Sequence, residues 1–335
     1  MIVDLWTHEL SLRHVGPHGH PERPQRVVAV SDAIRASSHE VMDREAPAVD
    51  VDLLREVHDV AYIEHIHSYC AAGGGSLDPD TYAVPASWDA ALRAAGAGPA
   101  AVDRLATRNA TAFVVMRPPG HHAERHKAMG FCLFNNIAVT AAYLRWRGDR
   151  VAIVDWDVHH GNGTQHTFYD DPEVLYVSLH AFPFYPGTGW VDEIGEGSAR
   201  GMTVNIPIPA RTDAMSYLAA FDQLAMPPLR QFDPDWILVS SGYDAHIDDP
   251  LGELNLASPH YGWMAAALAS VVPENRIVLF LEGGYDLAAL GSGAVATLDG
   301  VSGRGPREPW PTEIVGSAAK TTDIARTVLA DHWDL

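Results

Sequence analysis

The stretch Val151 to Gly163, VAIVDWDVHHGNG, decides how the rest of the chain is interpreted. It begins with four apolar residues of strong β propensity, which predict a buried strand over 151–154. It then reaches Asp155, Asp157 and His159, and core packing gives no reason for a strand to end on three such residues. Because side chains alternate along an extended chain, these three fall on one side. The stretch therefore predicts a metal site at the carboxyl end of a strand, where open α/β sheets place their chemistry.

The composition limits the class of protein. With 335 residues and 47% hydrophobic content the chain can bury a large core, and the absence of a linker predicts a single domain over 1–335. The two cysteines, Cys70 and Cys132, imply no disulfide framework and favour a reducing compartment. The beginning, MIVDLWTHEL, lacks the features of a signal peptide, and no apolar stretch predicts a membrane span, so the expected location is cytoplasmic.

The net charge of −20 bears on partners. A strongly acidic surface repels nucleic acid, so we expect no nucleic-acid partner. It would favour cationic partners such as lysine-bearing peptides or polyamines, although ordinary acidic solubility explains the charge equally simply. The sequence leaves open whether the chain forms a homo-oligomer.

Short, continuously apolar segments alternate with helical patterns along the chain. Strands are predicted over Ile2–Leu5, Thr111–Met116, Val151–Val154, Val174–Leu179, Thr203–Ile208, Trp236–Ser240 and Ile277–Leu281. Helices are predicted over 25–37, 57–72, 88–106 (with Ser87 as its N-cap), 137–146, 215–227, 261–270 and in the Pro- and Gly-punctuated segment that follows Gly303. This alternation predicts an α/β fold, with a central, mostly parallel sheet covered by helices on both faces.

Four of these strands end in polar, glycine-flanked sequences: RPPGHHA, VDWDVHHGNG, SSGYDAH and LEGGYD. The carboxyl ends of parallel strands meet at one edge, so Asp157, His159 and Asp244 can converge there. Each piece alone is weak, since D-x-H is common by chance and Asp244 could simply cap a helix. Together, two carboxylates and one imidazole form a three-ligand set with open positions, which suits catalytic zinc, but also iron(II) or cobalt.

Further residues of these segments could carry out proton transfer. The tandem pair His121 and His122 could move a proton beside a metal-activated water. Asp155 could bond the far nitrogen of one histidine, and Asn162 could serve the other, with less stabilisation of an imidazolium than a carboxylate gives. Tyr285 could direct its hydroxyl at the acyl oxygen, because the two preceding glycines allow the backbone close to a site.

Taken together, these motifs resemble the catalytic domain of the histone deacetylase superfamily. The resemblance rests on RPPGHHA, GFCLFNN, VDWDVHHGNGTQ, LYVSLH, SGYDAHIDDPLG and LEGGYD, and on the N-terminal HPERPQR over 20–26. It extends from about residue 5 to residue 300 and is greatest to class II enzymes and their bacterial relatives, the histone deacetylase-like and acetylpolyamine amidohydrolases.

The resemblance implies a role for each matching residue. It implies zinc bound by Asp157, His159 and Asp244, with His122 closest to acid–base work and His121 mainly electrostatic. Asp155 matches the partner of His121, Asn162 the class II asparagine and Tyr285 the transition-state tyrosine. It further implies one potassium site at Asp155, Asp157, His159, Ser178 and Leu179, and a second around Phe168, Asp171 and Val174. The tunnel for the acyl-lysine would be lined by Gly130, Phe131 and Tyr185, with Leu251 at the gatekeeper position.

The function that follows is a zinc-dependent amidohydrolase acting on an acylated lysine peptide or an acylated small amine. Leu251 stands where polyamine-selective relatives carry an acidic residue, which favours acyl-lysine, but an acetylpolyamine substrate stays open because Asp78, Asp80, Asp248, Asp249 and Glu253 are close to the predicted rim. An arginase-like binuclear manganese hydrolase lacks support, since Gly161 stands where its next aspartate would be. A catalytically silent acyl-lysine binding module is the remaining alternative.

Overall fold

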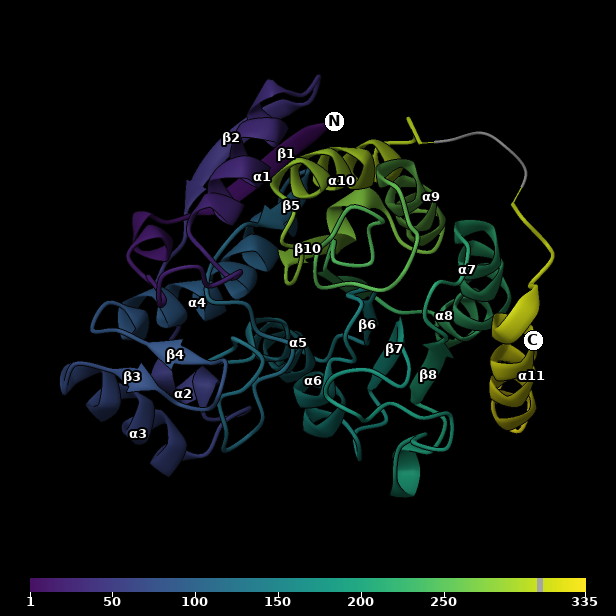
Figure 1. Ribbon diagram of the computed structural model, residues 1–335, viewed down its shortest axis with the longest axis horizontal. Coiled ribbons are helices and arrows are strands. Elements are labelled where there is room, and N and C mark those ends of the chain that lie inside the picture. The colour runs from purple at the N-terminus through teal and green to yellow at the C-terminus, as the bar shows by residue number, and fades with distance from the viewer. Residues whose placement is uncertain (306–309) are drawn as a thin grey trace.

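A sheet of eight strands forms the centre of the structure, a computed structural model that describes residues 1–305 and 310–335. Its strand order is β2-β1-β5-β10-β9-β6-β7-β8, and every neighbouring pair is parallel (Figure 1). The strands are β1 Ile2–Thr7, β2 Glu40–Glu45, β5 Thr111–Val114, β6 Val151–Asp155, β7 Val174–Ala181, β8 Thr203–Ile208, β9 Trp236–Ser241 and β10 Ile277–Leu281. The predicted α/β class with a parallel sheet is confirmed.

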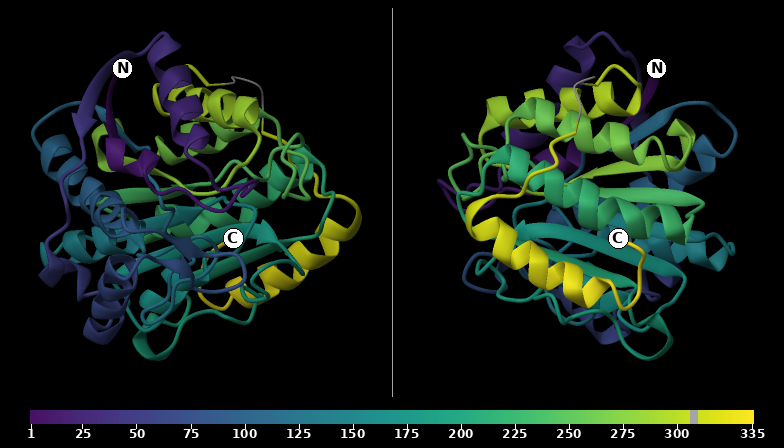
Figure 2. Two further views of the ribbon diagram at one scale, coloured as in Figure 1. Left: turned by 60° about the vertical axis from the view of Figure 1, so that its left-hand side comes forward. Right: turned by 90° about the vertical axis from the view of Figure 1, so that its right-hand side faces the viewer.

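Helices cover both faces of this sheet (Figure 2). In β6, Val151 and Ile153 pack into one hydrophobic core, whereas Ala152 and Val154 pack into the other, as the two-residue period of a strand requires. The first core takes its helical residues from α2 Val51–Leu54, α3 Val60–Ala71, α4 Ser87–Leu105 and α5 Asn136–Trp146. The second takes them from α1 Gln25–Ala36, α7 Ala214–Ala220, α8 Met226–Phe232, α9 Ser258–Leu268, α10 Leu287–Val301 and α11 Gly316–Leu329.

Smaller elements connect these layers. A two-stranded antiparallel sheet, β3 Gly75–Ser76 with β4 Tyr82–Ala83, lies in the loop before α4, and α6 Asn162–Thr167 follows the DVHHG sequence. Short 3₁₀ segments are η1 Glu9–Leu12, η2 Gly197–Ala199 and η4 Glu274–Arg276. Within the described ranges, no helix combines the length and the apolar composition that crossing a bilayer requires.

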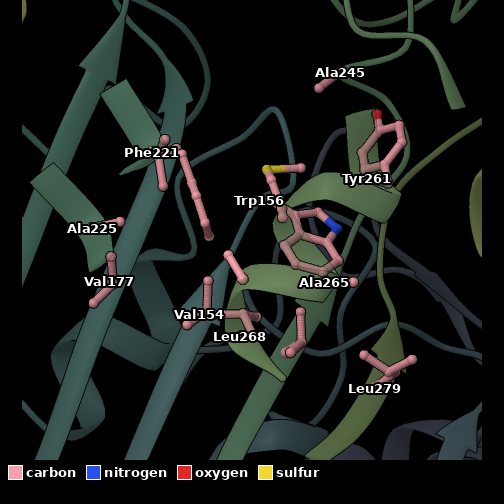
Figure 3. Close-up of a cluster of buried hydrophobic side chains, with 14 of the residues drawn as sticks. Val154, Trp156, Val177, Phe221, Ala225, Ala245, Tyr261, Ala265, Leu268 and Leu279 are labelled. Carbon is pink, nitrogen blue, oxygen red and sulfur yellow. The ribbon is translucent and has the colours of Figure 1, made fainter. Parts of the chain in front are cut away.

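Trp156 connects the core to the site. It is fully buried among helical and strand side chains (Figure 3), between Asp155, the last residue of β6, and Asp157, which follows the strand. Its ring lies 6.4 Å, centre to centre, from that of Tyr261 in α9. Burying so large an apolar side chain stabilises the fold by roughly 2–3 kcal/mol. The indole therefore holds the chain in place where Asp155 and Asp157 project to the functional edge of the sheet.

Besides the small elements β3, β4, α2 and α6, which have no predicted counterpart, the structure differs from the predicted elements most clearly in four further places. Strand β2 has no predicted counterpart, because EVMDRE is an edge strand that leaves its side chains largely exposed and shows no apolar run. Helix α10 also has none. The helix predicted over 215–227 is instead α7 and α8 with a π-helical turn, η3 Phe221–Ala225, between them, since the prolines of MPPLRQF can only occupy the first turn of α8. Ser87 is the first residue of α4 and not its cap, which is Ala86.

The loop before the last helix is described in part. Residues 306–309 of the segment predicted to be Pro- and Gly-punctuated lie outside the described ranges. Helix α11, predicted after this segment, packs Ala325 and Leu329 into the same core as α7.

Candidate metal centre and active site

Residues of the segments after β5, β6, β7 and β10 contribute to the wall of a cavity of about 470 Å³. Nine of the predicted site residues are in its wall: His121, His122, Gly130, Phe131, Asp157, His159, Tyr185, Leu251 and Tyr285. The remaining members of the predicted metal and catalytic set, Asp155, Asn162 and Asp244, are buried and each contacts a histidine of the wall. The parallel sheet thus brings together side chains that are far apart in the sequence.

Asp157, His159 and Asp244 form a three-donor group. Their ligand atoms all lie within 4.8 Å of one another, and within the described ranges no other such group of histidine, cysteine or acidic side chains occurs. Nδ1 of His159 lies 3.1 Å from Oδ1 of Asp157 and 3.2 Å from Oδ2 of Asp244. Two carboxylates therefore face one imidazole nitrogen across a gap that an ion can bridge.

The surroundings of this group fit a cation. Oδ2 of Asp244 is buried and makes no hydrogen bond of adequate geometry. Burial and the neighbouring carboxylate of Asp157 raise the pKa of Asp244 to about 7, because two negative charges share a buried site. Burial disfavours a charged His159, yet the carboxylates of Asp157 and Asp244 raise its pKa to about 10. A divalent cation would supply the missing positive charge, so these residues fit the predicted metal.

Two glycines let the backbone approach the carboxylates. A Cβ atom on Gly242 would lie 2.1 Å from Oδ2 of Asp157, and one on Gly283 would lie 2.0 Å from Oδ2 of Asp244. In return, the backbone N–H of Gly283 donates to Oδ2 of Asp157 at 2.7 Å. Glycine at these positions is therefore required by the space around the three-donor group.

The tandem histidines have different partners. His121 donates from Nδ1 to Oδ2 of Asp155 at 3.0 Å, and that carboxylate also accepts from the hydroxyl of Tyr176 at 3.2 Å and, at Oδ1, from the N–H of Asp157. Nδ1 of His122 lies 2.8 Å from Oδ1 of Asn162. The two rings are 4.0 Å apart between centroids.

These partners give the two histidines opposite charge states. Burial disfavours a charged His121, but Asp155 and Asp157 raise its pKa to about 10. Burial lowers the pKa of His122 far below its usual value, and the positive charge beside it on His121 lowers it further. Near neutral pH, His121 is therefore the charged member and His122 the neutral one, which can accept a proton.

Tyr285 lies in the cavity wall beside Phe131. Its ring packs edge to face on Phe131 with centroids 5.9 Å apart, and the guanidinium of Arg26 lies 5.0 Å from its centroid. Its backbone N–H donates to Oδ2 of Asp249 at 2.5 Å. Burial raises the pKa of the phenol well above its usual value, so its hydroxyl keeps the proton and can donate a hydrogen bond.

The wall of the cavity is mainly aromatic. Tyr185 meets His122 edge to face at 5.1 Å, and Phe184 stacks on His159 at 5.1 Å with an interplanar angle of 15°. Phe131 adopts a φ of 69°, which is uncommon for a residue with a side chain, and its N–H donates to Thr81. Leu251 is 37% exposed, consistent with a place at the mouth. Phe184 was not among the predicted wall residues, although FPFYPG places it directly before Tyr185.

The remaining predicted potassium residues belong to β7 and to the turns that precede it. Ser178 is the register partner of Asp155 across β6 and β7, and its hydroxyl contacts Nδ1 of His180 at 2.9 Å. The carbonyl of Leu179 accepts from the hydroxyl of Tyr217 at 3.4 Å. Phe168 and Asp171 lie in the turns between α6 and β7, and Val174 is the first residue of β7. Both potassium sites stay a prediction.

A buried ion cluster that the sequence did not reveal connects two of the quoted motifs. Glu22 of HPERPQR is fully buried and binds the guanidinium of Arg117, from RPPGHHA, and that of Arg26 at 3.1 Å. Arg26 also donates to the carbonyl of Gly284 at 2.6 Å. Burial alone would raise the pKa of Glu22, but Arg117 and Arg26 hold it at about 2. The cluster fixes the bases of the His121 and Tyr285 segments together.

Comparisons with known proteins identify the family of the chain. The family model described as the histone deacetylase domain matches residues 20–301. A "Probable deacetylase" of Archaeoglobus fulgidus is 36% identical over 322 residues, which cover 92% of this chain and 89% of that protein. The "Histone deacetylase-like amidohydrolase" of Pseudomonas aeruginosa is 38% identical over 297 residues, covering 85% and 77%.

A solved structure, the "HDA15 HD domain", matches with a TM-score of 0.92 and 32% identity over 99% of this chain and 95% of that one. The sequence is therefore similar to that of proteins named deacetylase or amidohydrolase, and the architecture is shared with the HDA15 HD domain. The chain belongs to the histone deacetylase family of hydrolases.

Proposed function

We propose that this chain is a zinc-dependent amidohydrolase that removes an acetyl group, or another acyl group, from the amine of a lysine side chain. The observation that carries the proposal is the convergence of the three-donor group with a neutral His122 and a protonated Tyr285 on one cavity. Residues 1–335 would act as one catalytic domain, because β1, near the beginning, and α11, near the end, both pack on the sheet that carries the site.

The metal would be held by Asp157, His159 and Asp244. Zinc suits this donor set, and iron(II) or cobalt would also fit, because affinity does not select among them. A metal ion bound there would polarise the acyl carbonyl and lower the pKa of a water molecule. Three protein ligands leave positions free for these groups.

The histidines would handle the proton. Since Nδ1 of His122 is engaged by Asn162, its Nε2 is the nitrogen free to take the proton of the attacking water and return it to the leaving amine. His121, held positive by Asp155, would stabilise the negative charge that develops on the acyl oxygen.

Tyr285 would donate its hydroxyl proton in a hydrogen bond to that same oxygen. Two contacts hold it in place, because its ring packs on Phe131 and its N–H is fixed by Asp249. Loss of one such donor costs about 10²–10³ in kcat in comparable acyl-transfer sites.

The cavity wall supports an apolar acyl-lysine stem as substrate. Phe131 and Tyr185 would flank the methylene groups, and Leu251 at the mouth offers no carboxylate to a second amine. Asp249 is engaged by three backbone N–H groups, of Leu251, Tyr285 and Asp286, which makes it a structural acceptor and a poor partner for a cationic substrate. One observation favours an acetylpolyamine as the second candidate, because Asp80 also lines the cavity.

The test combines two variants with two controls. His122→Ala and Tyr285→Phe should each lower kcat for an acetyl-lysine reporter by about 10²-fold or more, while zinc content stays at the wild-type level. The matched controls are His65→Ala and Tyr143→Phe, two residues on α3 and α5 that are not in the cavity wall. Wild-type rates in both site variants would refute the mechanism. A kcat/KM that strongly favours N-acetylputrescine over an acetyl-lysine peptide would replace the first substrate by the second.

A further inference from the structure

A chain of hydrogen bonds connects His122 to the surface of the protein. The amide of Asn162 presents Oδ1 to Nδ1 of His122, at 2.8 Å, and donates from Nδ2 to Oε1 of Glu124. The carboxylate of Glu124 also lies 2.8 and 3.0 Å, through its two oxygens, from Nδ1 of His166. Asn162 and His166 both belong to α6, whereas Glu124 comes directly after the RPPGHHA segment.

The chemistry of Glu124 fixes the direction of these hydrogen bonds. An ionised carboxylate can only accept, so the NH₂ group of Asn162 must face Glu124. Its carbonyl oxygen must then face His122, and an oxygen requires that Nδ1 of His122 carry the hydrogen. A neutral imidazole carries one hydrogen, so its Nε2 is left with the free electron pair that a base needs.

The amide has no other strong reason to keep this orientation. Besides Glu124, the described residues offer its Nδ2 only the carbonyl of His122 at 3.4 Å and Sδ of Met129 at 3.5 Å. Both contacts are weak. If Glu124 were absent, the amide could rotate and offer its NH₂ to His122, which would move the histidine hydrogen to Nε2 and remove the base.

Glu124 is held in position as a carboxylate. Its side chain is only 16% exposed, its N–H donates to the carbonyl of Lys127 at 2.9 Å, and its own carbonyl accepts from Nδ1 of His58 at 3.0 Å. Burial would raise its pKa, but the hydrogen bonds from His166 and Asn162 lower it below the usual value. It therefore stays ionised near neutral pH.

We infer that Glu124 is a positioning residue for the proposed deacylation: it fixes the amide of Asn162 and, through that amide, the tautomer of His122 with Nε2 free. Glu124 also places a negative charge near His122, which the neutral Asn162 does not supply. The inference rests on the proposed function for its catalytic consequence, whereas the tautomer is a property of the protein itself.

The first experiment measures that tautomer without using activity. Protein labelled with ¹⁵N in its histidines is examined by NMR, and the His122 signals are assigned with the His122→Ala variant. In the wild type, Nδ1 should show the shift of a protonated nitrogen and Nε2 that of an unprotonated one. Glu124→Ala should reverse or mix the two, whereas Glu64→Ala, an exposed glutamate on α3, should leave them unchanged. Unchanged His122 shifts in Glu124→Ala would overturn the inference.

The second experiment uses rescue. Glu124→Ala should lower kcat by about 10–100-fold with little change in KM, the usual loss for a partner one residue behind a catalytic group. Asn162→Asp alone should also lower kcat, because it places a second carboxylate against Glu124. The double variant Glu124→Ala with Asn162→Asp should recover most of the wild-type kcat, since an aspartate at 162 accepts from Nδ1 by itself. Losses that simply add in the double variant would contradict the inference.

A milder variant and a comparison of outcomes complete the test. Glu124→Gln keeps an acceptor oxygen but also gains a donor, so it should give an intermediate kcat, and it replaces Glu124→Ala if that variant does not fold. A wild type that is inactive on every acylated amine, with tautomer shifts that still respond to Glu124, would refute the proposed function alone. An active wild type whose kcat and shifts both ignore Glu124 would refute this inference alone.

Discussion

Replacement of Gly283 by alanine tests the metal centre through a single methyl group. Gly283 follows β10, and its backbone passes beside both carboxylates of the three-donor group. The added Cβ would lie 2.0 Å from Oδ2 of Asp244 and 2.5 Å from Oδ2 of Asp157, whereas real Cβ atoms essentially never come within 3.0 Å of another atom. Relief of both contacts therefore requires the first oxygen to move by about 1 Å and the second by about half as much.

The expected effect is larger on function than on folding. A misplacement of about 1 Å at a catalytic centre costs on the order of 10²-fold in rate, and we expect zinc affinity to fall by at least about tenfold. The cost of overpacking to the free energy of unfolding should be about 1–3 kcal/mol. Gly291→Ala in α10 is the matched control, because its Cβ would lie 2.9 Å from Cβ of Ala33 and near no carboxylate. It should lose some stability and keep wild-type zinc binding.

Three measurements decide the outcome. Zinc affinity is measured by competition with a chelator, turnover with an acetyl-lysine reporter, and Tm by circular dichroism with and without zinc. Zinc at 100 times its Kd should stabilise the wild type by about 2.7 kcal/mol, since it binds the folded state, and should stabilise Gly283→Ala much less. Wild-type zinc affinity together with wild-type turnover in Gly283→Ala would refute the placement of the metal between these carboxylates.

Two further changes probe the supports of the site. Glu22→Gln should cost about 3–5 kcal/mol in urea unfolding, because it leaves Arg117 buried without its partner. In the wild type the pKa of Glu22 is about 2 in the folded state, below the unfolded value of about 4.3. The ionised carboxylate therefore contributes fully to the free energy of unfolding above about pH 4.3, and this contribution is lost as the pH falls toward about 2. This pH dependence of stability should be absent from Glu22→Gln. His160→Ala removes the 2.8 Å contact with Thr188 in the loop that carries Tyr185 and should raise KM roughly fivefold at constant zinc content; an unchanged KM would count against a role for this contact.

Much of the fold could be predicted from the sequence, because strands that are buried on both faces have a recognisable apolar composition. The residues of β5, β6, β7, β8, β9 and β10 are buried on both faces, so each segment is mainly apolar and lacks the alternation of a half-exposed strand. Strand β2 is different, because among the described strands it pairs with β1 alone and leaves much of EVMDRE exposed. It therefore lacks the apolar pattern by which the other strands were predicted. This segment forms a strand because it pairs with β1, and its own residues give no indication of that pairing.

The candidate site was predictable to the extent that its residues end strands. Asp157 and His159 follow β6, and Asp244 follows β9, so the parallel pairing of those strands brings them to one edge. Glu22 and Glu124 were missed for the opposite reason. Glu22 lies in an irregular segment 95 residues before its partner Arg117, and Glu124 meets Asn162 only through the way α6 packs. Sequence spacing carries no information on such contacts.

The different partners of the two histidines explain how adjacent residues acquire opposite charges. His121 and His122 are both buried, so desolvation favours the neutral form of each. Asp155 touches His121 directly and overcomes that cost, whereas the amide of Asn162 does not overcome it for His122. A carboxylate in direct contact would raise the pKa of His122 further than the amide does. Glu124 instead orients the amide of Asn162, and the amide in turn orients the ring of His122. Because the charge of Glu124 acts on His122 from further away, the ring stays neutral.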